Sequence, residues 1–232
     1  MSKYLIHSCP KRQWYVEGYL IPSMLEQGIR AEDIMVYQDK ERKGNLKGYL
    51  DSCQKLLDVV GEEGGTWHMQ DDVLICSDFK KRTEILDAQK GIVCGFTSCY
   101  DGAPRQGTQP IHNMWWSFPC MRIPNSYLRD FLQWVEIWVW RDNQYAACTK
   151  ANKGDDYIFK VWAINYRKDD PMYGCVPTLV EHVDYLIGGS EVNKQRDENK
   201  NFSARSKEWQ EEYLVKRLEE RLREDGRLKK VK

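Results

Sequence analysis

The first 75 residues alternate between β-strand and α-helix patterns, and this alternation restricts the possible folds more than any other feature. Short apolar runs typical of strands are separated by longer segments with apolar residues at helical spacing. The segments are a strand at Lys3–Cys9, a helix at Trp14–Gln27 divided by Pro22, a strand at Asp33–Asp39, a helix at Asn45–Val60, and a third strand. This β-α-β-α-β order predicts an α/β fold with a mostly parallel sheet and helices on both faces.

Polar residues follow each of these three strands. The groups are Pro10-Lys11-Arg12, Gln38-Asp39 and Gln70-Asp71-Asp72. The carboxyl ends of parallel strands lie at one edge of a sheet, where ligands of such folds bind. We therefore expect the three groups to converge on one site.

The middle of the chain continues with alternating patterns. The expected segments are a helix at Asp78–Ala88, a strand at Gly91–Ser98, a polar loop at Tyr100–Asn113, a strand at Met114–Met121, a helix at Pro124–Arg141, a helical segment at Gly154–Ala163, and a segment at Pro177–Ser190 that ends in a Gly-Gly turn. These segments extend the predicted sheet and its helical layers.

A change of composition at residue 191 divides the chain. Residues 1–190 are expected to form the catalytic domain, and residues 191–232 a charged linker followed by an amphipathic helix. That helix, Ser206–Lys230, has Trp209, Tyr213, Leu214, Leu218 and Leu222 on one face. It either packs back on the domain or pairs with a partner helix, and in the second case it could form a homodimer.

The overall composition indicates a cytoplasmic protein without a membrane span. No apolar run approaches the ~20 residues needed to cross a bilayer, and the N-terminus lacks the apolar core of a signal peptide. The eight cysteines form no Cys-x-x-Cys pair, and several lie in apolar runs, as expected of buried, reduced thiols. The 35 basic and 35 acidic residues cancel, which argues against strong unaided binding to nucleic acid.

The adjacent acids Asp71 and Asp72 are the strongest candidates for chemistry. Carboxylates beside apolar residues are costly unless a cation or hydrogen-bond donors compensate them. The third strand is expected to end in this pair and to be followed by the apolar run Val73-Leu74-Ile75. In a strand, Gln70 and Asp72 project to one side and Asp71 to the other. Magnesium and manganese take one or two carboxylates together with substrate phosphates. Solvated Asp-Asp pairs are also common. The apolar residues on both sides of this pair are the reason to interpret it as a metal-binding pair.

His182, in the run Leu179-Val180-Glu181-His182, is a candidate second metal ligand. A single histidine is more often an ordinary core or surface residue, but an Asp pair about 110 residues earlier makes ligation credible. Asp155 and Asp156 could supply a general base for an acceptor hydroxyl. The alternative is a helix N-cap before the apolar residues that follow.

The other candidate residues allow a binding interpretation and a structural one. Arg12 and Lys11 could neutralise a diphosphate or remain solvated cations. Asp39 could accept hydrogen bonds from a base or a ribose, or serve as an acid of the loop. The pair Trp115-Trp116 could stack on a sugar or belong to the core.

Taken together, these motifs resemble those of GT-A-fold glycosyltransferases of the compact bacterial or phage-encoded kind. The resemblance covers residues 3–190. It is carried by four segments, namely Ile6-His7-Ser8-Cys9-Pro10-Lys11-Arg12, Tyr37-Gln38-Asp39, Trp67-His68-Met69-Gln70-Asp71-Asp72-Val73 as an Asp-x-Asp-type motif, and Leu179-Val180-Glu181-His182 followed by Gly188-Gly189-Ser190.

The resemblance implies a GT-A-like, Rossmann-type sheet and transfer of a sugar from a nucleotide-sugar donor to an acceptor. It implies that Asp72 and His182 hold Mn²⁺ or Mg²⁺, and that Asp155 or Asp156 is the base if the reaction inverts configuration. Pro10, Arg12, Asp39, Gln70 and Asp71 would contact the donor. Gln70 departs from the family pattern, which has an acid at this position, and this departure bears on metal dependence.

Three other functions fit parts of the sequence. A nucleotidyltransferase would need a Gly-rich first loop, where this chain has Cys9-Pro10-Lys11-Arg12. A non-catalytic nucleotide-binding module would fit the glutamine at position 70. A transferase acting on modified nucleic acid would use a basic patch formed by Lys194, Arg196, Lys200 and Arg205. The donor sugar, its nucleotide base, the acceptor and the stereochemistry leave no mark in the sequence.

Overall fold

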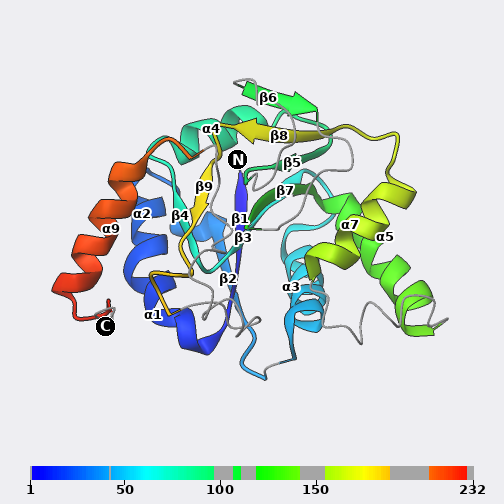
Figure 1. Cartoon of the computed structure of the whole chain (residues 1–232). Helices are drawn as coiled ribbons and strands as arrows, with labels where there is room; N and C mark the ends of the chain where they lie inside the picture. Colours follow the sequence, from blue (N-terminus) through cyan, green and yellow to red (C-terminus); the bar gives the residue numbers. More distant parts are fainter. Residues whose placement is uncertain are drawn as a thin grey trace.

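The computed structural model describes residues 2–41, 43–96, 107–110, 119–141, 155–188 and 209–228. It contains a seven-stranded sheet between two layers of helices, and a separate two-stranded sheet (Figure 1). The strands are β1 (Lys3–Ser8), β2 (Ile34–Gln38), β3 (Gly65–Gln70), β4 (Val73–Ile75), β5 (Ile92–Cys94), β6 (Gly107–Pro110), β7 (Cys120–Pro124), β8 (Met172–Val176) and β9 (Val180–His182). The main helices are α1 (Gln13–Tyr15), α2 (Ile21–Glu26), α3 (Asn45–Val60), α4 (Phe79–Leu86), α5 (Asn125–Trp134), α7 (Asp155–Tyr166) and α9 (Glu212–Glu224).

The large sheet is mostly parallel, as predicted. Its strand order is β2-β1-β3-β7-β5-β8-β6. β1 pairs in parallel with β2 and β3, and β5 pairs in parallel with β8. β7 runs antiparallel to both of its neighbours, and β6 runs antiparallel to β8. The sequence pattern could not foresee these reversals, because an apolar run fits a strand of either direction.

The first half of the chain follows the predicted order closely. The helical segment after β1 is divided as expected, because α2 begins beside Pro22 after a π-helical turn at Val16–Leu20. At this junction the amide of Ile21 donates to the carbonyl of Val16, five residues earlier. Pro22 has no amide hydrogen and cannot continue the regular ladder. The helix predicted to be capped by Asn45 and to run to about Val60 is confirmed, with Gly44 at the N-cap and Asn45 as the first helical residue.

The second half differs from the prediction in several places. β6 lies within the segment predicted as a loop, and β7 begins at Cys120, near the end of the predicted Met114–Met121 strand, whose residues before 119 are outside the described part. β8 was not predicted, because its Met-Tyr-Gly-Cys-Val sequence lacks a clear alternation. The helix predicted at Pro124–Arg141 is confirmed from Asn125 onward, ending in a π-helical turn at Val135–Arg141.

The third strand ends at the Asp pair and an apolar strand follows it, as predicted, but the side-chain alternation of a strand does not extend to Asp71 and Asp72. β3 ends at Gln70, Asp71 and Asp72 form a turn, and the chain leaves the large sheet. It resumes as β4, which pairs antiparallel with β9 in the two-stranded sheet. The sequence did not reveal that this second run belongs to another sheet, because an apolar run does not indicate its partner strand.

Apolar side chains fill both faces of the large sheet. One cluster packs Tyr4 and Ile6 of β1 against α1, α2, α4, α9 and the β4–β9 sheet. The other packs Leu5 of β1 against α3, α5 and α7. This alternation along β1 follows from the two-residue period of a strand, and it gives the three layers seen in Figure 1.

The C-terminal helix packs back on the domain, which is the first of the two predicted alternatives. Trp209, Val215, Leu218 and Leu222 lie in the same cluster as β1 and α2. The observed helix is shorter than the predicted Ser206–Lys230. Within the described ranges, none of the helices is long and apolar enough to cross a membrane.

Candidate functional site

The candidate site lies where β1 and β3 end side by side. His7 of β1 is opposite Gln70 of β3, so the turns that follow these parallel strands are adjacent. A short 3-10 helix at Pro10–Arg12 follows β1, and the turn at Asp71 and Asp72 follows β3. The carboxyl ends of parallel strands are the expected place for a ligand in such a fold.

Arg12 joins the two turns. Its side chain is buried, and its Nη1 atom lies 3.0 Å from Oδ1 of Asp71 and also contacts Oδ2 of Asp72. The tight turn that begins with exposed Pro10 directs Arg12 inward, and the Arg12 amide donates to the carbonyl of Cys9. A buried carboxylate pair is tolerable only with such compensation.

Asp71 is also held by the backbone after β1. Its Oδ2 atom accepts a hydrogen bond of 3.1 Å from the amide of Cys9. Burial and the neighbouring charge of Asp72 nevertheless raise the pKa of Asp71 above its ordinary value. The two adjacent carboxyl groups therefore have different electrostatic environments.

His182 reaches Asp72 from the other strand of the small sheet. Val73 of β4 is opposite His182 of β9, and Nε2 of His182 lies 3.1 Å from Oδ2 of Asp72. The amide of Val183 donates to the carbonyl of Asp72 over 2.8 Å, which fixes the turn against β9. The two residues expected to share a metal, 110 positions apart, are thus in direct contact.

The charges in this cluster shift the pKa values of both partners. Burial disfavours the charged form of each, but the opposite charges outweigh it. Because of His182 and Arg12, the pKa of Asp72 falls well below its ordinary value. The pKa of His182 rises above its ordinary value because of Asp72 and, to a smaller degree, Asp184.

Asp184 and Tyr15 belong to this site, although the sequence patterns did not single them out. Oδ1 of Asp184 lies 3.5 Å from Nδ1 of His182, and Asp184 is buried. The hydroxyl of Tyr15 donates to the carbonyl of Val73 over 2.9 Å. Asp184 lies only two residues after His182, and this spacing was the available signal for its contact. The contact of Tyr15 with Val73 has no signal in the sequence.

The cluster has the negative charge and the unengaged ligand atom that a divalent cation requires. Even with His182 protonated, the three buried carboxylates of Asp71, Asp72 and Asp184 outnumber the positive charges of Arg12 and His182. Oδ1 of Asp72 is buried and has no hydrogen-bond partner among the residues that the structure describes. Carboxylate oxygens are the preferred ligands of Mg²⁺, and an imidazole nitrogen also suits Mn²⁺ in mixed sites. The residues present therefore fit such an ion.

Asp39 and Gln70 lie at the same edge of the sheet. The amide of Asp39 donates to the carbonyl of Ser8 over 2.9 Å, which places it beside the end of β1. Its carboxylate accepts hydrogen bonds from the amides of Lys43 and Gly44, so it also orders the loop before α3. Gln70 is the last residue of β3, and its amide donates to the carbonyl of Pro119.

Asp155 and Asp156 are the first two residues of α7. Apolar residues of α7 pack in the same cluster as α3 and α5, on the sheet face opposite the β4–β9 sheet. Oδ1 of Asp156 accepts a hydrogen bond of 2.7 Å from the amide of Tyr157. The side chain of Asp155 is outside the described part, as are Trp115, Trp116 and the basic residues Lys194, Arg196, Lys200 and Arg205.

A second polar group, unforeseen from the sequence, lies across the sheet from this site, with His68 buried and His7 partly buried. His7 and His68 come from adjacent strands, with Nε2 of His7 3.4 Å from Nδ1 of His68. Ser52 of α3 lies 3.0 Å from Nδ1 of His7. Burial lowers the pKa of His7 to about 3 and also lowers that of His68, so both rings are neutral at pH 7.

Comparison with known proteins leaves the family open. No family model matches the chain, and no curated protein sequence matches it. A solved structure described as the crystal structure of A197 from STIV is similar to 79% of this chain and to 87% of its own length. The sequence identity is 13% and the TM-score is 0.45.

Proposed function

We propose that the chain is a glycosyltransferase that moves a sugar from a nucleotide-sugar donor to an acceptor with the help of a divalent cation. The observation that supports this proposal best is the contact of Arg12, Asp71, Asp72 and His182 at the carboxyl ends of β1 and β3. A cation, a carboxylate pair and an imidazole in one buried group suit the binding of a diphosphate. The GT-A-like motifs of the sequence point to the same activity.

Asp72 and His182 would hold Mn²⁺ or Mg²⁺. When bound, the ion supplies positive charge beside the diphosphate that leaves as the sugar is transferred. Arg12 adds a second positive charge at the same place, preorganised by its hydrogen bonds to Asp71 and Asp72. Asp71 keeps Arg12 in position and is itself held by the Cys9 amide.

The nucleoside end of the donor would lie along the edge formed by Pro10, Asp39 and Gln70. Asp39 is suited to accept hydrogen bonds from a base or a ribose, because it lies directly after β2 and beside β1. Its hydrogen bonds to the Lys43 and Gly44 amides hold the loop at that edge in place. Gln70 would contribute a neutral side chain where the family has an acid.

Activation of the acceptor would depend on the stereochemistry of the transfer. In an inverting reaction, Asp155 or Asp156 would take the proton of the acceptor hydroxyl. A retaining reaction would need no such base. Replacing both residues by Asn should therefore abolish transfer to an acceptor in the first case only.

The contact of Arg12 with both aspartates favours a second candidate, a nucleotide-binding module without turnover. Arg12 already neutralises part of the charge that a metal would neutralise. Such a module would bind a nucleoside diphosphate with similar affinity in the presence and absence of metal. This difference separates the two candidates experimentally.

The test of activity is release of nucleoside diphosphate from a set of common nucleotide sugars, with and without Mn²⁺. We expect release that depends on metal, and a loss of about 100-fold or more in Asp72→Asn and His182→Gln, because each removes charge stabilisation of the transition state. Asp58→Asn, a change at an exposed position of α3, is the matched control and should leave release unchanged. Metal-independent binding without release would favour the module.

A further inference from the structure

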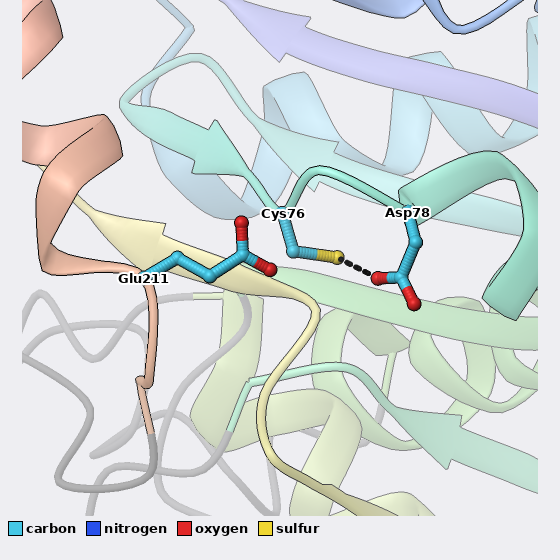
Figure 2. Close-up of side chains that lie close together, drawn as sticks. All are labelled: Cys76, Asp78 and Glu211. Atoms are coloured by element: carbon cyan, nitrogen blue, oxygen red, sulfur yellow. Dashed lines mark hydrogen bonds between the residues drawn. The ribbon is translucent and has the colours of Figure 1, made fainter.

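A thiol and two carboxylates from three different segments meet on the α9 side of the sheet. Cys76 directly follows β4, Asp78 directly precedes α4, and Glu211 directly precedes α9. The potential ligand atoms of these residues all lie within 4.8 Å of one another. In Figure 2 the two carboxylates lie on either side of the Cys76 thiol, which donates to Oδ1 of Asp78 over 3.4 Å.

The backbone holds the three residues in this arrangement. The amide of Cys76 donates to the carbonyl of Leu179, and the carbonyl of Cys76 accepts hydrogen bonds from the Phe79 amide and from Nε2 of Gln27. Glu211 is tied to the same loop, because its Oε2 atom accepts a hydrogen bond of 3.0 Å from the amide of Ser77. The cluster therefore lies on a fixed loop and is not a chance meeting of mobile surface acids.

A cavity beside the cluster gives an independent indication of a ligand. Its volume is about 670 Å³, and Asp78, Glu211, Thr178 and Trp209 are among the residues that line it. Thr178 is 1% exposed and Trp209 is 7% exposed. The Thr178 hydroxyl and the Trp209 indole nitrogen are buried, and neither has a hydrogen-bond partner within the described ranges. Buried polar atoms normally have partners, so a bound group is expected here.

We propose that Cys76, Asp78 and Glu211 form a binding site for a divalent ion of the zinc type. Zinc binds cysteine sulfur and carboxylate oxygen in tetrahedral sites, and three protein ligands leave one position for water. That position would face the cavity. The indole N–H of Trp209 can only donate a hydrogen bond, so it needs an acceptor that a bare cation lacks and that a metal-bound water supplies.

This site would differ in chemistry from the cluster at Asp72 and His182. The thiolate selects softer ions, whereas carboxylate and imidazole at the proposed transferase site suit magnesium or manganese. Arg82 lies near the thiol, with Nη1 3.8 Å from the sulfur of Cys76. Its guanidinium also donates hydrogen bonds to the carbonyls of Pro177 and Thr178, and these backbone oxygens partly offset its positive charge.

A metal at this site would fasten the start of α9 to the loop after β4. β4 also follows directly from the turn with Asp71 and Asp72. The ion would therefore join the start of the C-terminal helix to the strand that follows the turn of the candidate active site. Binding of this ion would not depend on the proposed transferase activity.

The test is titration of the metal-free full-length protein with Co²⁺, followed by competition with Zn²⁺. Co²⁺ takes zinc sites, and a bond to thiolate gives a near-ultraviolet charge-transfer band that a site with only oxygen and nitrogen ligands does not give. We expect this band to saturate at one Co²⁺ per chain, to disappear on addition of Zn²⁺, and to be absent in Cys76→Ser. It should persist in Asp72→Asn, which separates the two metal sites, and in the thiol control Cys53→Ser on the opposite face of the sheet.

The buried position of Cys76 makes a second variant necessary. Glu211→Gln changes a partly exposed side chain and should lower the affinity for Co²⁺ about tenfold or more, because a charged ligand is lost. Glu220→Gln, at an exposed position of α9, is its matched control and should bind like the original protein. Absence of a thiolate band in the folded protein, a band that survives Cys76→Ser, or equal affinities of the two glutamate variants would overturn the proposal.

Discussion

The two buried histidine groups on either side of the sheet have opposite electrostatics. His182 lies against Asp72 and Asp184, and its pKa is raised despite burial. His7 and His68 lie against each other and Ser52, and burial lowers the pKa of both. The comparison shows that the local partner, and not the depth of burial, decides whether an imidazole here carries a charge.

The titration of the histidines should show this contrast most strongly. We expect the pKa of His182 above 6.5 and that of His7 near 3, a separation of more than three pH units. The measurement is a pH series of histidine ring signals by NMR, with His68→Gln and His182→Gln used for assignment. Equal titration near pH 6.5 would show that the two environments do not differ as described.

The same shifts predict opposite effects of pH on stability. The folded-state pKa of His7 is below its unfolded value. The contribution of neutral His7 to the free energy of unfolding is therefore full above about pH 6.5 and is lost as the pH falls toward 3. The folded-state pKa of His182 is above its unfolded value, so its contribution is full below about pH 6.5 and is lost as the pH rises through the folded value. Urea unfolding of His7→Gln and His182→Gln at pH 5 and pH 8 separates these contributions.

Removing the charge of Asp72 should cause the largest loss of stability. Asp72→Asn leaves Arg12 and His182 buried with one carboxylate fewer, and breaking a buried pair in this way costs about 3 kcal/mol in the free energy of unfolding. It should also lower the pKa of His182 below 6.5, because burial then dominates. Urea unfolding at pH 7 gives the first value and NMR the second. A loss under about 1 kcal/mol would mean that the cluster is less tightly coupled than its contacts indicate.

The neutral group should respond less. Ser52→Ala removes the hydrogen bond to Nδ1 of His7 and should lower the free energy of unfolding by about 1–2 kcal/mol. The pKa of His182 should not change, because Ser52 lies on the other face of the sheet. A shift in the His182 titration would show coupling across the sheet that the contacts do not suggest.

An ion pair with half-exposed partners gives the smallest effect and a reference for both groups. Asp33 accepts hydrogen bonds from Arg30 and Lys3, which hold its pKa near 2. Solvent screens both cations, so Asp33→Asn should cost only about 1 kcal/mol at pH 7. This stabilisation is present above about pH 4 and is lost as the pH falls through about 2. A pH series of unfolding midpoints for the variant and the original protein measures it.

The sequence patterns were sufficient for the α/β class and for the strand and helix order of the first half. The helix that begins at Asn45 and runs to about Val60 was predicted well, because its apolar spacing is regular and glycines follow it. β8 was missed, because a strand of five residues without a clear alternation shows no period. The pairing of β4 with β9 in a separate sheet was not foreseen either, because an apolar run does not indicate its partner strand.

The site was only partly accessible from the sequence. Asp72 and His182 were paired through a family resemblance, and the structure places them in contact. The contact of Asp184 with His182, two residues earlier, was within reach of the sequence but was not singled out. The contacts of Tyr15 and of the His7–His68 group could not be foreseen, because their partners are distant in the chain and lie in ordinary apolar segments. The cluster of Cys76, Asp78 and Glu211 unites residues up to 135 positions apart, and no local pattern reveals such a meeting.

Calorimetric titration with uridine and guanosine diphosphate, each with and without Mn²⁺, tests the central claim most directly. The claim is that the buried group of Arg12, Asp72 and His182 binds a metal together with a diphosphate. We expect one of the nucleotides to bind at one site per chain, at least tenfold more tightly with Mn²⁺, and this gain to vanish in Asp72→Asn but not in Asp58→Asn. Absence of binding by both nucleotides, or a metal effect unchanged in Asp72→Asn, would contradict it.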